Sequence, residues 1–538
     1  MDLDLTPEET EKLSRELCHP VTPDAVIGSS PSGDTDYAIE VIYGPGVMDP
    51  EGRSAKSLAE IVFGRKFPFD KKIAVLHQRR IKGSFTDVQL RKIAGQFYND
   101  IVQNVKVFPR KELQQGIGPY MSPVEVPPPG PILHYDLNAR FDFEDLVNEL
   151  ARNAENKDKA REEAKKKSDS WLKAAKEYYE CDVSETNPSL NLLRISDGRM
   201  LALNLEEMAS IKGHYSRPDI IEARKKVGLS GKATDVELEL FGQTWSEHCK
   251  HKIFNADVSY IEGGIEERIK EGIFNRFIKS ATLAIQKQKP DFIKSVLWDN
   301  SGVVDIDPKA SNYVCFKCET HNSPSFLEPY GGAITGIVGV YRDPLGTGRG
   351  SLLIFGVWGY CTGSIFYDGD LRPPLHPDQL IEGIHHGVRD GGNKHGVPNA
   401  IGGTFFDDGF MGKCLVYVGA AGLVPKVVDG RPGYEKWVDQ GDRVIVVGGR
   451  VGKDGIHGAI ASSEGYHKNT PKGHVQIGDP YTQKNVQEFM WEALAEGLIN
   501  FSQDSGAGGT GSAAGKTVRD EEVYIPNPIN RFEKAESK

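Results

Sequence analysis

The side chains best suited to chemistry in this chain lie between positions 315 and 350, which read CFKCETHNSPSFLEPYGGAITGIVGVYRDPLGTGRG. Glu319 and Asp343 offer carboxylate oxygens, the hard ligands that Mg²⁺ prefers. Lys317 and Arg342 offer positive charge to phosphate groups, and His321 titrates near neutral pH. Small, backbone-permissive residues separate them. This inventory predicts a site for a polyanionic nucleotide and a divalent cation along a short segment rich in strand.

A second segment, 234–257 (TDVELELFGQTWSEHCKHKIFNAD), has the pattern of an amphipathic helix that Thr234 or Asp235 would cap. Side chains recurring every three or four residues predict a buried stripe, made of Leu238, Phe241, Trp245 and Cys249. A neighbouring stripe holds Thr244, His248 and His251. His248 could then project into a cleft, although an isolated histidine in such a place is more often structural.

Three other patterns imitate known sites. Cys315 and Cys318 form a CxxC, but positions three apart on a strand face opposite sides, which argues against zinc or redox chemistry. Residues 506–511 match GxGxxG, a weak signal by itself. Residues 508–517 (GGTGSAAGKT) miss the GxxxxGK[ST] spacing of a phosphate-binding loop. We expect the glycines of these last two patterns to let the backbone approach a phosphate closely.

Three long motifs resemble, in the same order, those of the phosphoribosylformylglycinamidine synthase family, the ATP-dependent ligases of purine biosynthesis. Segment 315–350 resembles its Glu-Thr-His-Asn signature, and segment 234–257 resembles its Ser-Glu-His-Cys helix. Segment 474–515 resembles its Gln-(Ile/Val)-Gly-Asp-Pro and Asp-(Asn/Ser)-Gly-Ala-Gly-Gly motifs. The resemblance covers roughly 200–515 well and the N-terminal part more loosely.

The resemblance implies amidation of formylglycinamide ribonucleotide to formylglycinamidine ribonucleotide, with ATP as substrate, Mg²⁺ as cofactor and glutamine-derived ammonia. It implies catalytic roles for His248 and His321. The other implied roles are ATP binding by Lys317 and His251, substrate binding by Thr320, Asn322, Ser323, Arg342 and Gln476, and metal binding by Glu319, Asp343 and Asp504. At two of these positions the family commonly has another residue, namely tyrosine at 251 and histidine at 323.

The expected fold class is α/β (α+β), with strands at 37–43 and 443–449 and helices at 54–63 and 87–102. The resemblance implies half of a core like that of aminoimidazole ribonucleotide synthetase, in which a β-rich domain pairs with a counterpart to form a barrel. The predicted domains are an N-terminal extension (1–35), a small α/β domain resembling the family's accessory subunit (36–120), a Pro-rich and helical linker (121–230), the barrel-forming domain (231–425) and an α/β domain (426–538).

Composition limits the function classes. A formal net charge of −11 over 538 residues argues against a general nucleic-acid or membrane-surface binder, so a phosphate site must be a local positive patch. The longest apolar run, near 352–361, is far shorter than the roughly 20 residues of a membrane span. The N-terminus has no apolar signal-peptide segment, and seven cysteines without framework spacing fit a reducing cytoplasm.

The Glu-Thr-His-Asn pattern occurs once, whereas family cores contain two related halves, so we expect this chain to hold the first half. One hypothesis is a subunit that acts with a second-half synthetase chain, or as a homodimer, and with a glutaminase. The alternatives are a non-catalytic scaffold that recruits a glutaminase and a homodimeric ATP-dependent kinase or ligase with another substrate. Retention of Glu319, His321, Asp343 and Asp504 disfavours the scaffold.

Overall fold

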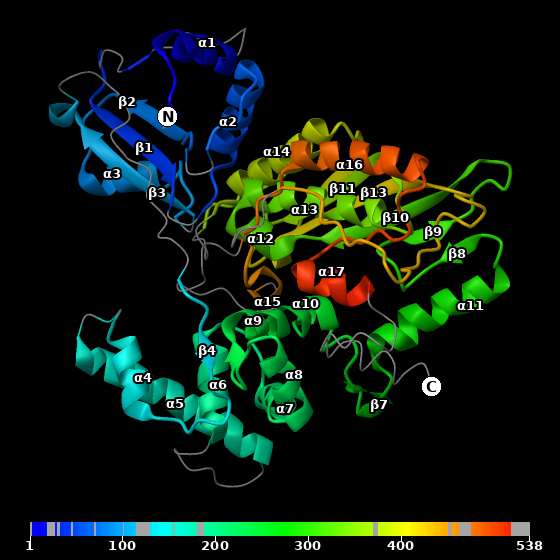
Figure 1. The fold of residues 1–538 in the computed structure, drawn as a ribbon. Helices are drawn as coiled ribbons and strands as arrows, with labels where there is room; N and C mark the ends of the chain where they lie inside the picture. The colour runs from blue at the N-terminus through cyan, green and yellow to red at the C-terminus, as the bar shows by residue number, and fades with distance from the viewer. Residues whose placement is uncertain are drawn as a thin grey trace.

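The computed structural model describes residues 3–18, 27–28, 33–44, 47–68, 71–100, 102–113, 130–152, 154, 156–179, 188–369, 375–449, 455–461 and 475–517. Parts of the predicted N-terminal extension, residues 127–129 of the predicted linker and the polar tail 527–538 lie outside the described residues. Three groups of elements follow one another along the chain (Figure 1).

The N-terminal group is a three-stranded antiparallel sheet of order β2-β1-β3 with helices beside it (Figure 1). The strand predicted at 37–43 is confirmed. The helix predicted from 54 begins earlier, at Pro50, because the Asp49 carboxylate accepts a hydrogen bond from the Gly52 N–H at 2.7 Å. The elements are α1 (Pro7–Leu17), β1 (Tyr37–Tyr43), α2 (Pro50–Phe63), β2 (Leu76–Ile81), α3 (Asp87–Ala94), β3 (Gln103–Pro109) and η1 (Arg110–Glu112).

The helix predicted over 87–102 is wrong in length. Helix α3 ends at Ala94, where Gly95 forms the C-cap and its N–H donates to the Arg91 carbonyl at 2.9 Å. The chain then turns and enters β3. Gly95 itself stays in the right-handed region with φ of −59°, and the helix ends there although the apolar pattern continues beyond it.

The middle group is mainly helical and has its own apolar core, which includes Trp171, Met208 and Leu238. A two-stranded antiparallel pairing of β4 with β5 ties its two ends together. The elements are β4 (His134–Tyr135), α4 (Phe143–Leu150), α5 (Lys157–Tyr179), α6 (Pro188–Gly198), α7 (Leu205–Tyr215), α8 (Pro218–Lys226), β5 (Ala233–Thr234), α9 (Asp235–Thr244) and α10 (Glu247–Lys250).

The single helix predicted from 235 is interrupted. Thr234 caps α9 as expected, accepting from the Glu237 N–H at 3.2 Å. Helix α9 stops at Thr244, and Ser246 caps the short helix α10 by accepting from the Cys249 N–H at 3.3 Å. The predicted buried stripe therefore holds for its first half only, and Cys249 is exposed.

The third group is built on a six-stranded sheet of order β12-β11-β13-β10-β9-β8. Only β11 and β12 pair in parallel; the other neighbours are antiparallel. Helices α13 and α14 cover one face of this sheet and share a core with it (Figure 1). The elements are β8 (Ile293–Ser295), β9 (Gly302–Val304), β10 (Asn312–Thr320), α12 (Asn322–Leu327), α13 (Pro329–Leu345), β11 (Leu352–Thr362), α14 (Pro377–His395), β12 (Asn399–Phe406), η3 (Asp408–Phe410) and β13 (Leu415–Pro425).

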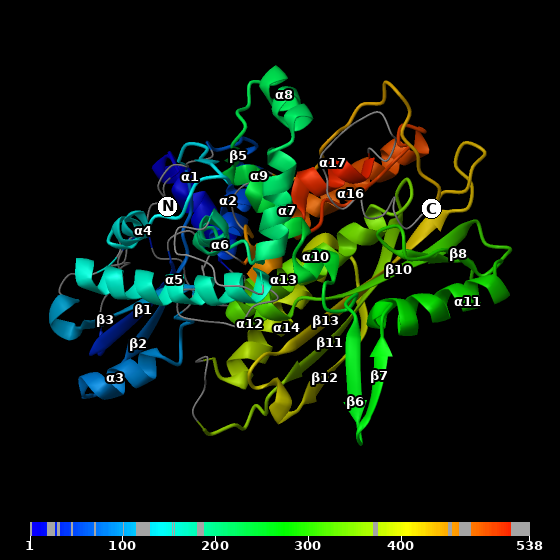
Figure 2. The same ribbon diagram turned by 90° about the horizontal axis from the view of Figure 1, so that it is seen from below.

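A β-hairpin and a helix lie between the middle group and this sheet, and Figure 2 shows the hairpin projecting from the molecule. They are β6 (Val258–Glu262), β7 (Ile265–Ile269), the π-helical turn η2 (Phe274–Lys279) and α11 (Ser280–Gln288). Beyond the sheet the chain forms α15 (Gly458–Ala461), α16 (Pro480–Ala495) and α17 (Gly509–Thr517). Among the described residues, no helix is long and apolar enough to cross a membrane.

Two strand predictions fail in this group. The segment before Arg342 is the helix α13, because glycines let it pack closely on α14: a Cβ added at Gly391 would lie 2.1 Å from Ile337 Cγ2. An apolar run buried on all sides has no periodicity that separates helix from strand. Residues 443–449 form no strand, and Val444 is 73% exposed. A strand needs a hydrogen-bonded neighbour, and none of the described residues supplies one here.

Candidate active site

The predicted phosphate-binding and metal-binding residues meet where the end of β10 passes over α13. Lys317 and Glu319 alternate with exposed residues along β10 and share the face of buried Cys315. Cys318 faces the other way, so the CxxC does not form a paired site, as expected. The floor below Glu319 is a glycine: a Cβ added at Gly339 would lie 3.8 Å from Glu319 Oε1 and 3.7 Å from Arg342 Nη2.

Two ion pairs connect the segments that carry these residues. Lys317 Nζ lies 3.5 Å from Asp343 Oδ2. Arg342 Nε donates to Asp504 Oδ1 at 2.8 Å, which joins α13 to the loop before α17. This loop can approach α13 only because position 346 is glycine, since a Cβ there would lie 2.7 Å from the Asp504 nitrogen. The structure therefore brings Lys317, Arg342, Asp343 and Asp504 together.

Three carboxylates share this cluster with two cations. Burial raises the pKa of Asp343 to about 8, and the neighbouring Glu319 and Asp504 add to the rise while Lys317 opposes it. Asp343 is 8% exposed. A buried carboxylate beside two others favours either a proton or an additional positive charge. An additional bound cation would therefore stabilise the cluster.

The acidic residues supply oxygen donors only, which suits a hard divalent cation. Within the part of the chain that the structure describes, no three His, Cys, Asp or Glu side chains are close enough to hold a metal ion by themselves. Mg²⁺ commonly takes one or two carboxylates and completes its shell with water and substrate phosphates. The residues present fit that mode of binding rather than a cage made by the protein.

His321 follows directly after β10 and is held against α13. Its Nδ1 lies 2.5 Å from the Gly332 carbonyl oxygen. Because a carbonyl can only accept, Nδ1 must donate its proton, and Nε2 of the neutral ring is left with a free lone pair. Burial lowers the pKa of His321, with a smaller opposing effect from Glu319, so the ring favours the neutral form. This arrangement can accept a proton at Nε2.

His248 reaches the same cluster from the middle group of helices. Its side chain is exposed on α10, but the surrounding protein partly desolvates it and lowers its pKa, while the nearby Glu319 carboxylate opposes this effect. His251 ends α10 in a left-handed conformation with φ of 53° and is exposed. The structure thus brings His248 within electrostatic reach of Glu319 and Lys317, with His251 beside His248.

The predicted substrate-binding residues are less uniformly placed. Thr320 lies on the exposed face of β10, opposite Glu319. The Asn322 side chain accepts a hydrogen bond from the Val416 N–H at 2.8 Å and so serves the start of β13, while Ser323 is buried in α12. The Gln476 carbonyl accepts from the Thr335 hydroxyl, two helical turns before Arg342 on the same face of α13. The structure does not bring Thr320 and Asn322 into the charged cluster.

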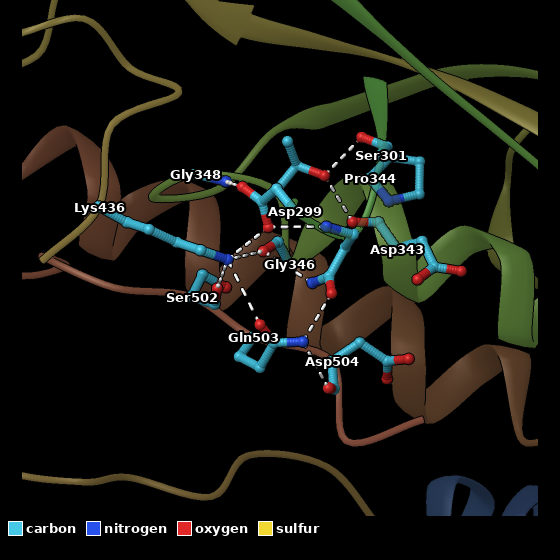
Figure 3. A network of polar contacts seen from close by, with 12 residues as sticks. Asp299, Ser301, Asp343, Pro344, Gly346, Gly348, Lys436, Ser502, Gln503 and Asp504 are labelled. Carbon is cyan, nitrogen blue, oxygen red and sulfur yellow. Dashed lines mark hydrogen bonds and ion pairs between the residues drawn. The ribbon is translucent and has the colours of Figure 1, made fainter. Parts of the chain in front are cut away.

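Sequence reasoning missed a buried network behind the cluster (Figure 3). Lys436 pairs with Asp299, and both side chains are almost fully enclosed, at 3% and 0% exposure. Neither residue belongs to a motif with a known spacing. The only signal in the sequence is the pair of polar residues that follows Asp299, in the run WDNSG.

Comparison with known proteins identifies related domains along the chain. Three domain profiles match consecutive parts of the chain: the formylglycinamide ribonucleotide amidotransferase linker domain at 192–252, the N-terminal domain of AIR synthase related proteins at 298–424, and their C-terminal domain at 439–536. The matched part of the chain is similar to the phosphoribosylformylglycinamidine synthase family, whose linker domain it contains together with the two AIR synthase domains. Within it, the ion pair of Arg342 with Asp504 joins the regions matched by the N- and C-terminal profiles.

Curated members of the family are similar over part of their length. Phosphoribosylformylglycinamidine synthase subunit PurL of Thermoplasma volcanium is 31% identical over 61% of this chain, and the match spans 38% of that relative. PurL of Thermotoga maritima is 33% identical over 54% of this chain and 40% of its own length. The chain therefore spans about two fifths of the relatives it matches. The solved structure of T. maritima PurL complexed with FGAR is 31% identical, with a TM-score of 0.38, over 55% of this chain and 40% of that one.

Proposed function

We propose that this chain is part of an enzyme that uses ATP to convert formylglycinamide ribonucleotide into formylglycinamidine ribonucleotide. The terminal phosphoryl group of ATP would move to the amide oxygen, and ammonia derived from glutamine would then displace phosphate from the resulting iminophosphate. The observation that carries this proposal is the meeting of Lys317, Arg342 and three carboxylates beside His321. The curated relatives support it, because their names include that activity.

Each residue of the cluster has a role that its geometry suits. Lys317 would contact the ATP phosphates, and Arg342 would hold an anionic group of the substrate once Asp504 turns to the metal. Glu319 would hold one Mg²⁺, and Asp343 with Asp504 would hold a second; when bound, these ions neutralise charge on the phosphoryl group being transferred. His321 would take up the proton that ammonia loses, at the Nε2 left free by the Gly332 carbonyl.

Four of the predicted contacts need a different description. His248 would act at the rim of the site rather than deep within it, because its side chain is exposed. Gln476 would approach the substrate from the loop that Thr335 fixes. Thr320 and Asn322 would contribute through the backbone of the turn that carries His321, since their side chains are directed elsewhere.

We further propose that the active form contains a second-half synthetase chain, or a second copy of this chain, together with a glutaminase in the cytoplasm. Large apolar side chains on the sheet support an association: Phe316 of β10 is 39% exposed, and Ile401 and Phe405 of β12 are 70% and 64% exposed. Apolar groups exposed to this extent commonly mark an interaction surface. A scaffold without catalysis would have no use for the charged cluster, which disfavours that alternative.

The test is phosphate release from ATP in the presence of formylglycinamide ribonucleotide, ammonium and Mg²⁺, with the chain alone and with a second-half synthetase chain. We expect substrate-dependent release in at least one arrangement. Glu319→Gln should lower turnover on the order of 10²–10³-fold, because it removes charge aimed at the reacting phosphoryl group. Glu162→Gln on the exposed face of α5 is the matched control and should leave turnover unchanged. Release that is indifferent to Glu319→Gln would refute the proposal, and silence in both arrangements would favour the scaffold.

A further inference from the structure

Lys436 is a buried cation that lies behind the charged cluster. Its ammonium pairs with the Asp299 carboxylate, and the two side chains are 3% and 0% exposed (Figure 3). Burying two charges costs free energy that their attraction repays only when the geometry is good and further hydrogen bonds form. A pair of apolar residues of similar volume would often be as stable. The pair therefore needs a reason beyond stability.

The ammonium joins three segments that are far apart in the sequence. Besides Asp299, Lys436 Nζ donates to the Ser502 carbonyl at 3.0 Å and lies 3.4 Å from Gln503 Oε1 and 3.5 Å from the Gly346 carbonyl. Asp299 in turn accepts from the Gly348 N–H at 2.8 Å. One cation thus connects the turn before β9, the turn after α13 and the loop before α17.

Two of these segments carry acidic residues of the cluster. Gln503 donates to Asn300 Oδ1 at 2.6 Å and to the Asp504 carbonyl at 2.9 Å, which fixes the backbone of Asp504. On the other side, the Thr347 hydroxyl donates to the Asp343 carbonyl at 2.8 Å and lies 2.5 Å from the Ser301 hydroxyl. Figure 3 shows the Asp343 and Asp504 side chains pointing to the same side, away from Lys436.

We propose that Lys436 and Asp299 are positioning residues that set the separation of the Asp343 and Asp504 carboxylates, and through it the affinity for Mg²⁺ with ATP. This inference rests on the proposed function. The pair anchors both backbones at one point, so the two acids keep a fixed spacing although they come from segments about 160 residues apart. Their own side chains cannot do this, because like charges repel.

The test is the affinity of the full chain for Mg²⁺ with a non-hydrolysable ATP analogue, measured by calorimetry together with the melting temperature. Lys436→Met keeps the volume but removes the charge, and we expect affinity to fall on the order of tenfold to a hundredfold, since the loss of a residue that orients metal ligands has that effect. Lys426→Met is the matched control. Lys426 forms another enclosed pair, 2.8 Å from Asp305 with 16% and 11% exposure, on the far end of β13. The Lys426→Met variant should lower the melting temperature without changing the affinity for Mg²⁺ and nucleotide by more than about twofold.

The double variant Asp299→Asn with Lys436→Met separates positioning from stability. Removing both charges should restore much of the melting temperature lost in Lys436→Met, because no buried charge is left unpaired. Affinity should stay low, because the three segments have lost their common anchor. If affinity recovers together with the melting temperature, or if it never falls, the pair is purely structural and the inference is wrong.

Two further outcomes are distinguishable. Should Lys436→Met fail to fold, Gln503→Ala removes the link between Asn300 and Asp504 without leaving a buried charge, and it should weaken affinity in the same direction; unchanged affinity would overturn the inference. If the unmodified chain, with or without a second-half chain, binds no nucleotide, the proposed function fails and the inference falls with it. If the unmodified chain binds the nucleotide and the variants bind it with the same affinity, the inference is wrong but the proposed function stands.

Discussion

Glu328 makes the stability of this protein depend on pH in a way that one substitution should remove. Its side chain is 5% exposed and caps α13, accepting a hydrogen bond from the Gly331 N–H. Burial raises the pKa of Glu328 from an ordinary 4.5 to about 7, and the backbone hydrogen bonds of the cap oppose this only in part. The folded protein therefore prefers the neutral carboxyl.

The sign and size of the effect follow from this difference. Below pH 4.5 the carboxyl is neutral in the folded and unfolded states, and burial carries no charge penalty. As pH rises from 4.5 through 7, only the unfolded state gains by ionising, so the folded state loses stability over this window. At about 1.4 kcal/mol per pH unit the full loss is about 3 kcal/mol, reached above pH 7. For a unit of 150–250 residues this corresponds to roughly 6–12 °C in melting temperature.

Glu328→Gln keeps an oxygen that can accept from the Gly331 N–H but cannot ionise. We expect its melting temperature to exceed that of the unmodified chain by roughly 6–12 °C at pH 8, and by much less at pH 5. Differential scanning calorimetry at both values checks this. Asp142→Asn, which alters the exposed cap of α4, should give no such gain. An equal difference at pH 5 and pH 8 would refute the reasoning.

Three other predictions concern the site and the docking of the N-terminal group. Gly336→Ala should lower kcat on the order of 10²-fold or more, since its Cβ would lie 2.8 Å from His321 Cβ and displace the proposed base; Gly339→Ala, whose Cβ meets only ordinary contacts at 3.7–3.8 Å, should be tolerated in a steady-state assay. His321→Gln should lower kcat by a similar factor with little change in nucleotide affinity by calorimetry, and a large loss of affinity would contradict the role as base. Arg53→Ala removes the 2.8 Å ion pair between α2 and Asp479, and because both side chains are partly exposed it should cost at most about 1 kcal/mol, seen as faster hydrogen exchange in α2.

The residues that carry charge were predictable from the sequence because they lie in long motifs with fixed order. Lys317 and Glu319 share a face by simple strand alternation, and Thr234 caps its helix as the pattern indicates. The Arg342 contact with Asp504 was not predictable from spacing, because it spans 162 positions and depends on a loop passing over Gly346. Lys436 was missed for the same reason: its importance comes from three segments that meet only in the folded chain.

The failed strand predictions have a shared physical cause. Period-2 and period-3.6 patterns separate strand from helix only when one side of the element faces water. Helix α13 is buried nearly all round, so its sequence carries no such contrast. The run 443–449 is apolar without a partner strand among the described residues, and apolar composition alone does not make a strand. In both cases tertiary surroundings decided the structure.

The packing around α13 explains why the motif at the site is rich in glycine. In an isolated helix each glycine costs about 1 kcal/mol relative to alanine, so four in one helix oppose its formation. Three of the four have a use at the site: position 332 admits the backbone of α12 at 2.3 Å from a would-be Cβ, position 336 admits His321, and position 339 lies beneath Glu319 and Arg342. The helix thus gives up intrinsic stability so that functional side chains can lie directly on its backbone. Packing against α14 and the sheet offsets that loss, which ties the chemistry of the cluster to the core behind it.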